Sequence, residues 1–235
     1  ASVTSGSGNT ALGYQSGYSL TTSNQNTAIG YKALREHVGG GSNTVLGHNA
    51  MSQTAGTNAA TSAYNVAIGR DALAGDWADA TSDNNIAIGC FVMDAVMDDA
   101  NSNIGIGYSS LSALTAGDLN VAVGQESLAS LTDGSRNIAI GFDAAKAMTS
   151  ANRNLAIGYE ALRTEDADGD RTTAIGYQAL YSQNSGTEAT GNTAVGYTSG
   201  YWNVTGVNNT YMGYGSGGSG AGGAASHSNN TGVGW

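Results

Sequence analysis

The sequence predicts an all-β chain folded as a parallel β-roll, or β-solenoid, of about thirteen 17-residue coils. One motif, of which Asn26-Thr27-Ala28-Ile29-Gly30-Tyr31 is an example, occurs thirteen times along the 235 residues. Successive motif glycines are most often 17 residues apart, and the longer spacings place extra residues in the connectors. The residues before each glycine alternate between larger aliphatic and small side chains, which is the period of a strand. We therefore expect a single repeat domain over residues 1–235.

Each motif is expected to form a short strand that ends at its glycine, which is numbered position 0. Position −1 is always Leu, Ile, Val or Met, position −3 is Thr or aliphatic, and position −2 is mostly Ala. Alternate side chains of a strand face opposite sides, so we expect −3 and −1 to face the core and −2 to face outward. Small side chains at −2 would allow another backbone to approach closely, as at a symmetry axis. The alanines assigned to this axis are Ala11, Ala28, Ala67, Ala87, Ala122, Ala139, Ala156, Ala174 and Ala194.

The remaining positions of the motif complete the predicted coil. The glycine supplies a bend or a positive φ. Positions +3 and +4 are expected to begin a second short strand, with the frequent Leu at +4 turned inward. Asn occupies −4 in twelve copies, which predicts a ladder of amides that bond to neighbouring backbone groups, or alternatively an ordinary turn residue. Stacked coils would pair in parallel at about 4.8 Å.

Composition excludes several classes of protein. With 8 basic and 18 acidic residues the net charge is −10, which disfavours nucleic acid and anionic membrane surfaces as partners. No apolar run is long enough to span a membrane. The single cysteine rules out an internal disulfide framework and is compatible with an extracellular protein.

The sequence offers one candidate metal site and no catalytic motif. Asp166, Asp168 and Asp170 resemble a short Ca²⁺ loop, with oxygens at alternate positions, but lack the distal Glu of an EF-hand. A solvated acidic connector is the alternative, and no other cofactor is predicted. Neither an HExxH nor a GxSxG pattern occurs. We therefore expect the chain not to be an enzyme.

Aromatic residues are the candidates for recognition. Trp77 and Trp202 lie in connectors, where binding residues can be carried without disturbing the stacked coils. Both are predicted receptor-binding residues, with inert loops as the alternative. Tyr is frequent at +1, which predicts either a stacked ladder along the roll or a stripe of rings that binds sugars.

The repeat resembles a known family. The pattern Asn-x-Ala-Ile-Gly-x-x-Ala/Ser resembles the YadA-like head repeats of trimeric autotransporter adhesins. The longer form, Asn-Thr-Ala-Ile-Gly-Tyr-x-Ala-Leu, is similar to repeats of bacteriophage tail fibres, and the match extends over residues 9–235. The resemblance implies a left-handed roll, a homotrimer and a role in attachment. The 17-residue period is longer than that of the adhesin heads, which leaves bacterial and phage origins open.

Together these observations predict a non-enzymatic structural and adhesive fibre module. It would be extracellular, at a cell surface or on a virion fibre, and would bind a host or surface receptor such as a glycan. The alternative is a subunit of an extracellular filament that stacks head to tail. An ice-binding protein is disfavoured because Thr at −3 exchanges with aliphatic residues and is therefore expected to face inward. A polysaccharide-cleaving spike would need two facing carboxylates, and no pair is marked.

Overall fold

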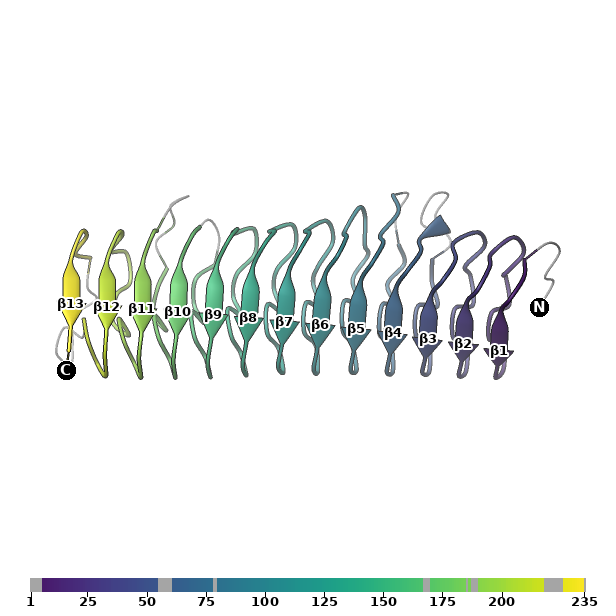
Figure 1. Cartoon of the computed structure of the whole chain (residues 1–235), viewed down its shortest axis with the longest axis horizontal. Helices are drawn as coiled ribbons and strands as arrows, with labels where there is room; N and C mark the ends of the chain where they lie inside the picture. The colour runs from purple at the N-terminus through teal and green to yellow at the C-terminus, as the bar shows by residue number, and fades with distance from the viewer. Residues whose placement is uncertain are drawn as a thin grey trace. The chain divides into compact units, whose positions relative to one another are not determined.

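The computed structural model describes residues 6–54, 61–77, 80–166, 170–184, 186, 190–217 and 226–234. Contacts divide the chain into two compact units, Ala1–Leu119 and Asn120–Trp235. Both are built from three-residue parallel strands, one in each motif, which confirms the predicted all-β solenoid (Figure 1). The described residues include no helix with the length and apolar character needed to cross a membrane.

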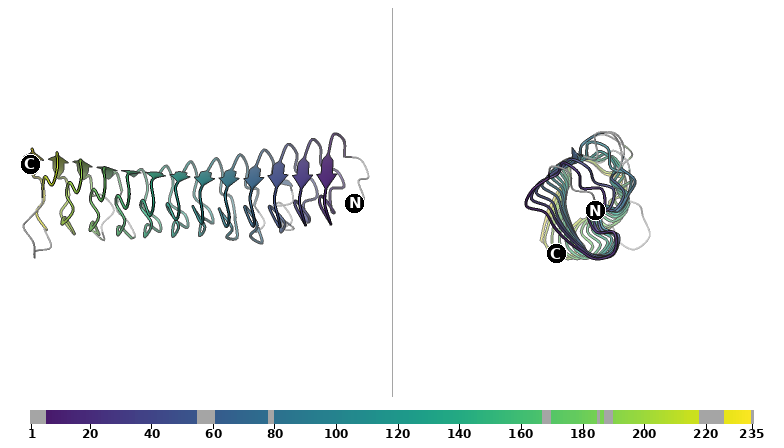
Figure 2. Two further views of the ribbon diagram at one scale, coloured as in Figure 1. Left: turned by 90° about the horizontal axis from the view of Figure 1, so that it is seen from below. Right: turned by 90° about the vertical axis from the view of Figure 1, so that its right-hand side faces the viewer.

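Every strand covers positions −3 to −1 of its motif, as predicted. The strands of the first unit are β1 (Thr10–Leu12), β2 (Thr27–Ile29), β3 (Thr44–Leu46), β4 (Val66–Ile68), β5 (Ile86–Ile88) and β6 (Ile104–Ile106). Those of the second unit are β7 (Val121–Val123), β8 (Ile138–Ile140), β9 (Leu155–Ile157), β10 (Thr173–Ile175), β11 (Thr193–Val195), β12 (Thr210–Met212) and β13 (Thr231–Val233). Within each unit, consecutive strands pair so that equal motif positions are opposite, as Ala28 is to Ala11. The strands of each unit lie along one side of its coils (Figure 2).

The predicted orientation of the strands was wrong. Of the nine alanines assigned to a symmetry axis, only Ala11 in β1 is exposed, whereas Ala28, Ala67, Ala87, Ala122, Ala139, Ala156, Ala174 and Ala194 are fully buried within the single chain. A Cβ atom placed on Gly105, at −2 of β6, would lie 2.6 Å from Cγ1 of Val92 and 2.9 Å from Cε of Met93. Position −2 therefore points into the coil, and −3 and −1 point outward. Small residues occur at −2 because the coil is narrow.

The substitution of Tyr for Ala at −2 of β12 demonstrates how narrow the interior is. Tyr211 is only 5% exposed. Its ring fits because the +4 positions on either side, usually Leu, are glycines here. A Cβ on Gly200 would lie 2.9 Å from Cδ2 of Tyr211, and one on Gly217 would lie 2.3 Å from its Cδ1. The interior volume of neighbouring coils is thus conserved by exchanging large and small residues between −2 and +4.

The second strand predicted after each glycine is absent from the described residues, where turns take its place. Residues at +2 and +4, such as Lys32 (φ 55°) and Leu34 (φ 51°), have a left-handed backbone that no β-strand contains. The coils still bond to each other here, since Lys32 N–H donates to the Tyr14 carbonyl at 2.8 Å and Leu34 N–H to that of Ala50 at 3.0 Å. The predicted inward direction of the +4 Leu is confirmed, because Leu34, Leu73 and others are fully buried.

The predicted asparagine ladder is confirmed. In β8's coil, the Asn137 N–H donates to Oδ1 of Asn120 at 2.9 Å, and Asn137 Oδ1 accepts the N–H of Asn154 at 3.0 Å. Asn137 Nδ2 also donates to the carbonyl of Ala151 at 2.8 Å. The amide therefore joins three successive coils and satisfies backbone groups at a buried corner.

Candidate functional site

The outward side of the strands forms an apolar surface in each unit, here called the strand face and made of the −3 and −1 side chains. None of the residues at these positions is ionisable; all are Thr, Val, Ile, Leu or Met. In β4–β6 and in β7–β9 both positions are aliphatic throughout. Leu46 is 46% exposed and Ile140 is 38% exposed. Surfaces in contact with water usually carry charged side chains among the apolar ones, so this face is unusually apolar for an exposed one.

An aromatic ladder runs along the second unit at position +1. Phe142, Tyr159, Tyr177, Tyr197 and Tyr214 stack with ring centroids 5.0–5.1 Å apart and planes within 10° of parallel. The stacked ladder expected from the sequence is therefore formed. Because each inner ring has both faces covered by its neighbours, the ladder presents ring edges and hydroxyl groups to solvent. The inner rings consequently have no open face for a sugar ring.

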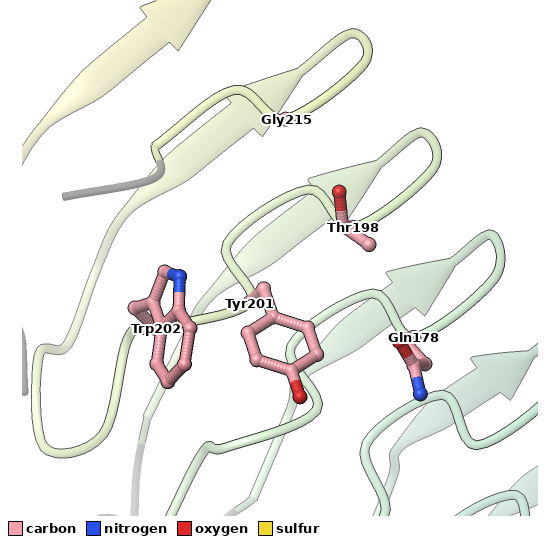
Figure 3. Close-up of a pocket in the computed structure, with 5 residues that line it drawn as sticks. All are labelled: Gln178, Thr198, Tyr201, Trp202 and Gly215. Atoms are coloured by element: carbon pink, nitrogen blue, oxygen red, sulfur yellow. The ribbon is translucent and has the colours of Figure 1, made fainter. Parts of the chain in front are cut away.

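A second group of aromatic rings lies beside this ladder and is called the aromatic corner; its members are Tyr181, Tyr201 and Trp202. Tyr201 stacks on Tyr181 at 5.0 Å, and Trp202 meets Tyr201 edge to face, with centroids 4.7 Å apart and planes at 73°. Here the corner borders a cavity of about 310 Å³ that is also lined by Gln178, Thr198 and Gly215 (Figure 3). The side chain of Trp202 is 41% exposed. Trp202 is thus placed on a concave surface, as a binding residue would be.

Trp77 does not lie on the surface, so its prediction as an exposed receptor-binding residue was wrong. Its side chain is only 2% exposed and is one of the largest in the core. It follows the repeat glycine at the same distance as Met97, which is also fully buried. The extra connector residues come after Trp77, and the indole fills the coil like other apolar residues of its position.

The candidate Ca²⁺ residues are only partly described. Asp168 lies outside the described residues, and Asp166 is exposed. The carboxylate of Asp170 accepts the backbone N–H of Asn152 at 2.5 Å. Across the ranges that the structure describes, no three His, Cys, Asp or Glu side chains gather as metal ligands would.

Charged side chains of the second unit form a small network around Asp143. Asp143 is 3% exposed, and its Oδ2 lies 3.3 Å from Nζ of Lys146 and 3.2 Å from Nε of Arg163. Lys146 also pairs with Glu126. The hydrogen bond between them raises the pKa of Lys146 and lowers that of Glu126. Both groups therefore stay charged at neutral pH, and the ion pairs of the network link neighbouring coils.

Comparison with known family models, curated proteins and solved structures found no match to this chain.

Of the corner, only Trp202 was predicted from the sequence as a binding residue. The side chains of the strand face were expected to point into the core. Tyr181 and Tyr201 share position +5 of consecutive motifs, and this recurrence could have indicated that their rings stack. The strand face could have been inferred from position +4. The Leu at +4 already fills the coil interior, so the larger side chains at −3 and −1 have to point outward. Gln178 and Thr198 carried no signal, because their role depends on the three-dimensional proximity of two coils.

Proposed function

We propose that this chain is a non-enzymatic structural and adhesive module of a homotrimeric attachment fibre. The observation that carries the proposal is the strand face, a repeated apolar surface without ionisable residues on a water-exposed side of each unit. The resemblance of the repeat to adhesin heads and phage tail-fibre repeats supports the number three, a left-handed roll and a location outside the cell or on a virion.

The proposed trimer contact is the strand face, in place of the alanines at −2 that were expected from the sequence. Three chains that turn their strand faces inward would bury two outward columns of Val, Ile, Leu and Thr in each unit. Burial of apolar surface contributes about 25 cal/mol per Å². Because consecutive strands supply the same pair of positions, even modest burial per coil would accumulate along a unit. The coil sides that carry the aromatic corner would stay accessible to a receptor.

Oligomeric state in solution tests this function. The purified chain should scatter light with three times the mass of one chain. Ile140→Glu places a carboxylate on the strand face of β8 and should yield monomers, because three buried charges would meet at the contact. The matched control is Leu119→Glu. Leu119 is 51% exposed but lies outside the strands, so this variant should remain trimeric. A monomeric parent at high concentration would refute the proposal.

Ice binding is a second candidate, favoured by one specific observation. Thr at −3 faces outward, contrary to the expectation that had counted against this function. Strands β1–β3 and β10–β13 all carry it, for example Thr44 beside the outward Leu46. A monomer that lowers the freezing point of water without lowering its melting point would favour this function. A trimer without this effect would exclude it.

A further inference from the structure

The aromatic corner differs from the ladder in the surface that its rings present. Each inner ladder ring lies between parallel rings about 5 Å away, as Tyr177 does between Tyr159 and Tyr197. That spacing leaves no room for a third ring. In contrast, the planes of Tyr201 and Trp202 are inclined at 73°, so one ring presents its edge to the other, and Trp202 does not lie between two parallel rings. The corner places the Trp202 indole beside a cavity (Figure 3).

Neutral polar groups line the same cavity. Thr198 contributes a hydroxyl, and Gln178 contributes an amide whose Nε2 donates to Oε2 of Glu160 at 2.7 Å. That bond fixes the amide and directs its nitrogen away toward Glu160. Burial, and then the neighbouring Tyr181 and Glu160, raise the pKa of Tyr201. Its hydroxyl therefore stays protonated at neutral pH and can donate as well as accept.

These features match the chemistry of a sugar ring. A hexopyranose has one face of C–H groups that packs on an aromatic ring, and hydroxyl groups around its edge that need donors and acceptors. The cavity is at the lower end of the range for small-ligand sites. None of its described lining residues carries a charge, and the chain as a whole has a net charge of −10. An anionic sugar would meet repulsion without a compensating cation.

We propose that the corner of Tyr201 and Trp202 binds a hexopyranose unit of a neutral glycan, with the sugar packed on the indole and its hydroxyls bonded to Gln178, Thr198 and Tyr201. The inference rests on the attachment function proposed above and specifies its receptor chemistry. Binding by one such site in each chain would be weak, and three copies in a trimer would strengthen attachment through multivalency.

The test uses the full chain and defined sugars. Saturation-transfer NMR is recorded with the methyl glycosides of glucose, galactose, mannose and N-acetylglucosamine, and with methyl sialoside as the anionic probe. At least one neutral glycoside should receive saturation, and sialoside should not. Trp202→Ala should abolish the transfer, and Gln178→Ala should reduce it severalfold. Circular dichroism and the melting temperature establish that each variant is folded.

Tyr159→Ala is the matched control. Tyr159 is 42% exposed, close to the 41% of Trp202, but it lies between two ladder rings. Its loss should leave the saturation unchanged. Equal loss in Tyr159→Ala and Trp202→Ala, binding of sialoside alone, or no transfer to any neutral glycoside would overturn the proposal. A trimer that binds none of these sugars would retain the fibre function and remove only the sugar site.

Discussion

At the scale of single residues, the repeat glycine satisfies two constraints at once. Gly141 has a φ of 138°, and a Cβ on it would lie 2.3 Å from the carbonyl oxygen of Gly158 in the next coil. Gly186 also has a positive φ, of 60°, but a Cβ placed on it would meet no atom within 4 Å beyond its chain neighbours. At Gly186, therefore, only the positive φ favours glycine. The close approach of coil to coil, rather than φ alone, makes glycine necessary in the motif.

Alanine substitutions separate these two constraints. Gly141→Ala combines backbone strain with displacement of a coil and should lower the free energy of unfolding by about 3–5 kcal/mol. Gly186→Ala carries only the cost of a left-handed backbone, about 1–2 kcal/mol. Urea denaturation of both variants measures the difference. Equal losses would show that the backbone angle alone selects glycine.

His37 gives the first unit a dependence on pH. Its ring is fully buried, with Nδ1 3.2 Å from Oγ1 of Thr54 and Nε2 3.4 Å from Nδ2 of Asn43, and neither neighbour ionises. Burial lowers the pKa of His37 from 6.5 to about 4, against weaker opposing bonds to the backbone of Gly40 and Ser62. Between these values the unfolded chain binds a proton that the folded chain does not. The contribution of the neutral His37 ring to stability is therefore complete above pH 6.5 and is lost as the pH decreases toward 4.

The pKa difference for His37 corresponds to about 3 kcal/mol, lost progressively from pH 6.5 to 4. His37→Gln should remove this part of the pH dependence while leaving the contribution of the carboxyl groups. Unfolding free energies of parent and variant at pH 7, 5.5 and 4 provide the comparison. If both lose the same stability over this range, the His37 ring is protonated in the folded state.

At the scale of the coil, the asparagine ladder joins backbone and side chain. Asn137→Ala removes the Nδ2 bonds to Asn120 and Ala151 and leaves the N–H of Asn154 without its Oδ1 acceptor. Buried groups left without partners cost about 1–3 kcal/mol each, so we expect a loss of about 2–4 kcal/mol in unfolding free energy. Gln125 is exposed, and Gln125→Ala should stay within about 0.5 kcal/mol of the parent. Thermal or urea denaturation of the two variants tests this, and similar values would mean that water replaces the ladder.

The sequence was sufficient to predict where strands form but not which way they face. Alternation at −3, −2 and −1 sets the period of the strand, and both orientations have that period. The choice depends on the width of the coil, which the sequence expresses indirectly, through the Leu at +4 and through pairs such as Tyr211 with Gly200. The turns after the glycine were missed for a related reason. Ordinary residues such as Leu34 adopt a left-handed backbone there, where hydrogen bonds between coils hold the turn in place, as that from the Leu34 N–H to the Ala50 carbonyl does.

The candidate site was predictable only in part. Trp202 and Trp77 look alike in the sequence, since each follows its motif glycine by several residues. Their distances from that glycine differ by two residues, and this offset places the Trp77 ring inside the coil and the Trp202 ring outside. The perpendicular contact of Trp202 with Tyr201 is a local side-chain geometry that no repeat pattern encodes.

At the scale of the whole molecule, apolar burial and charge would act against each other in the proposed trimer. The strand face carries no ionisable residue, whereas the chain has a net charge of −10. Three chains brought together would therefore repel one another over distances longer than the contact itself. The Debye length decreases from about 30 Å at 0.01 M salt to about 3 Å at 1 M, so added salt screens this repulsion. Salt leaves the apolar contact in place.

Association should consequently strengthen as salt is added. Raising NaCl from about 0.01 M to about 0.5 M should lower the concentration at which the proposed trimer dissociates, on the order of tenfold, because repulsion between like-charged chains is screened over this range. Sulfate should have a larger effect than chloride at equal ionic strength, since it also strengthens apolar burial. Sedimentation velocity over a dilution series gives the midpoint in each buffer. Trimers that instead dissociate in high salt would indicate an interface held by ion pairs, and the contact would then have to lie on a charged side of the coil rather than on the strand face.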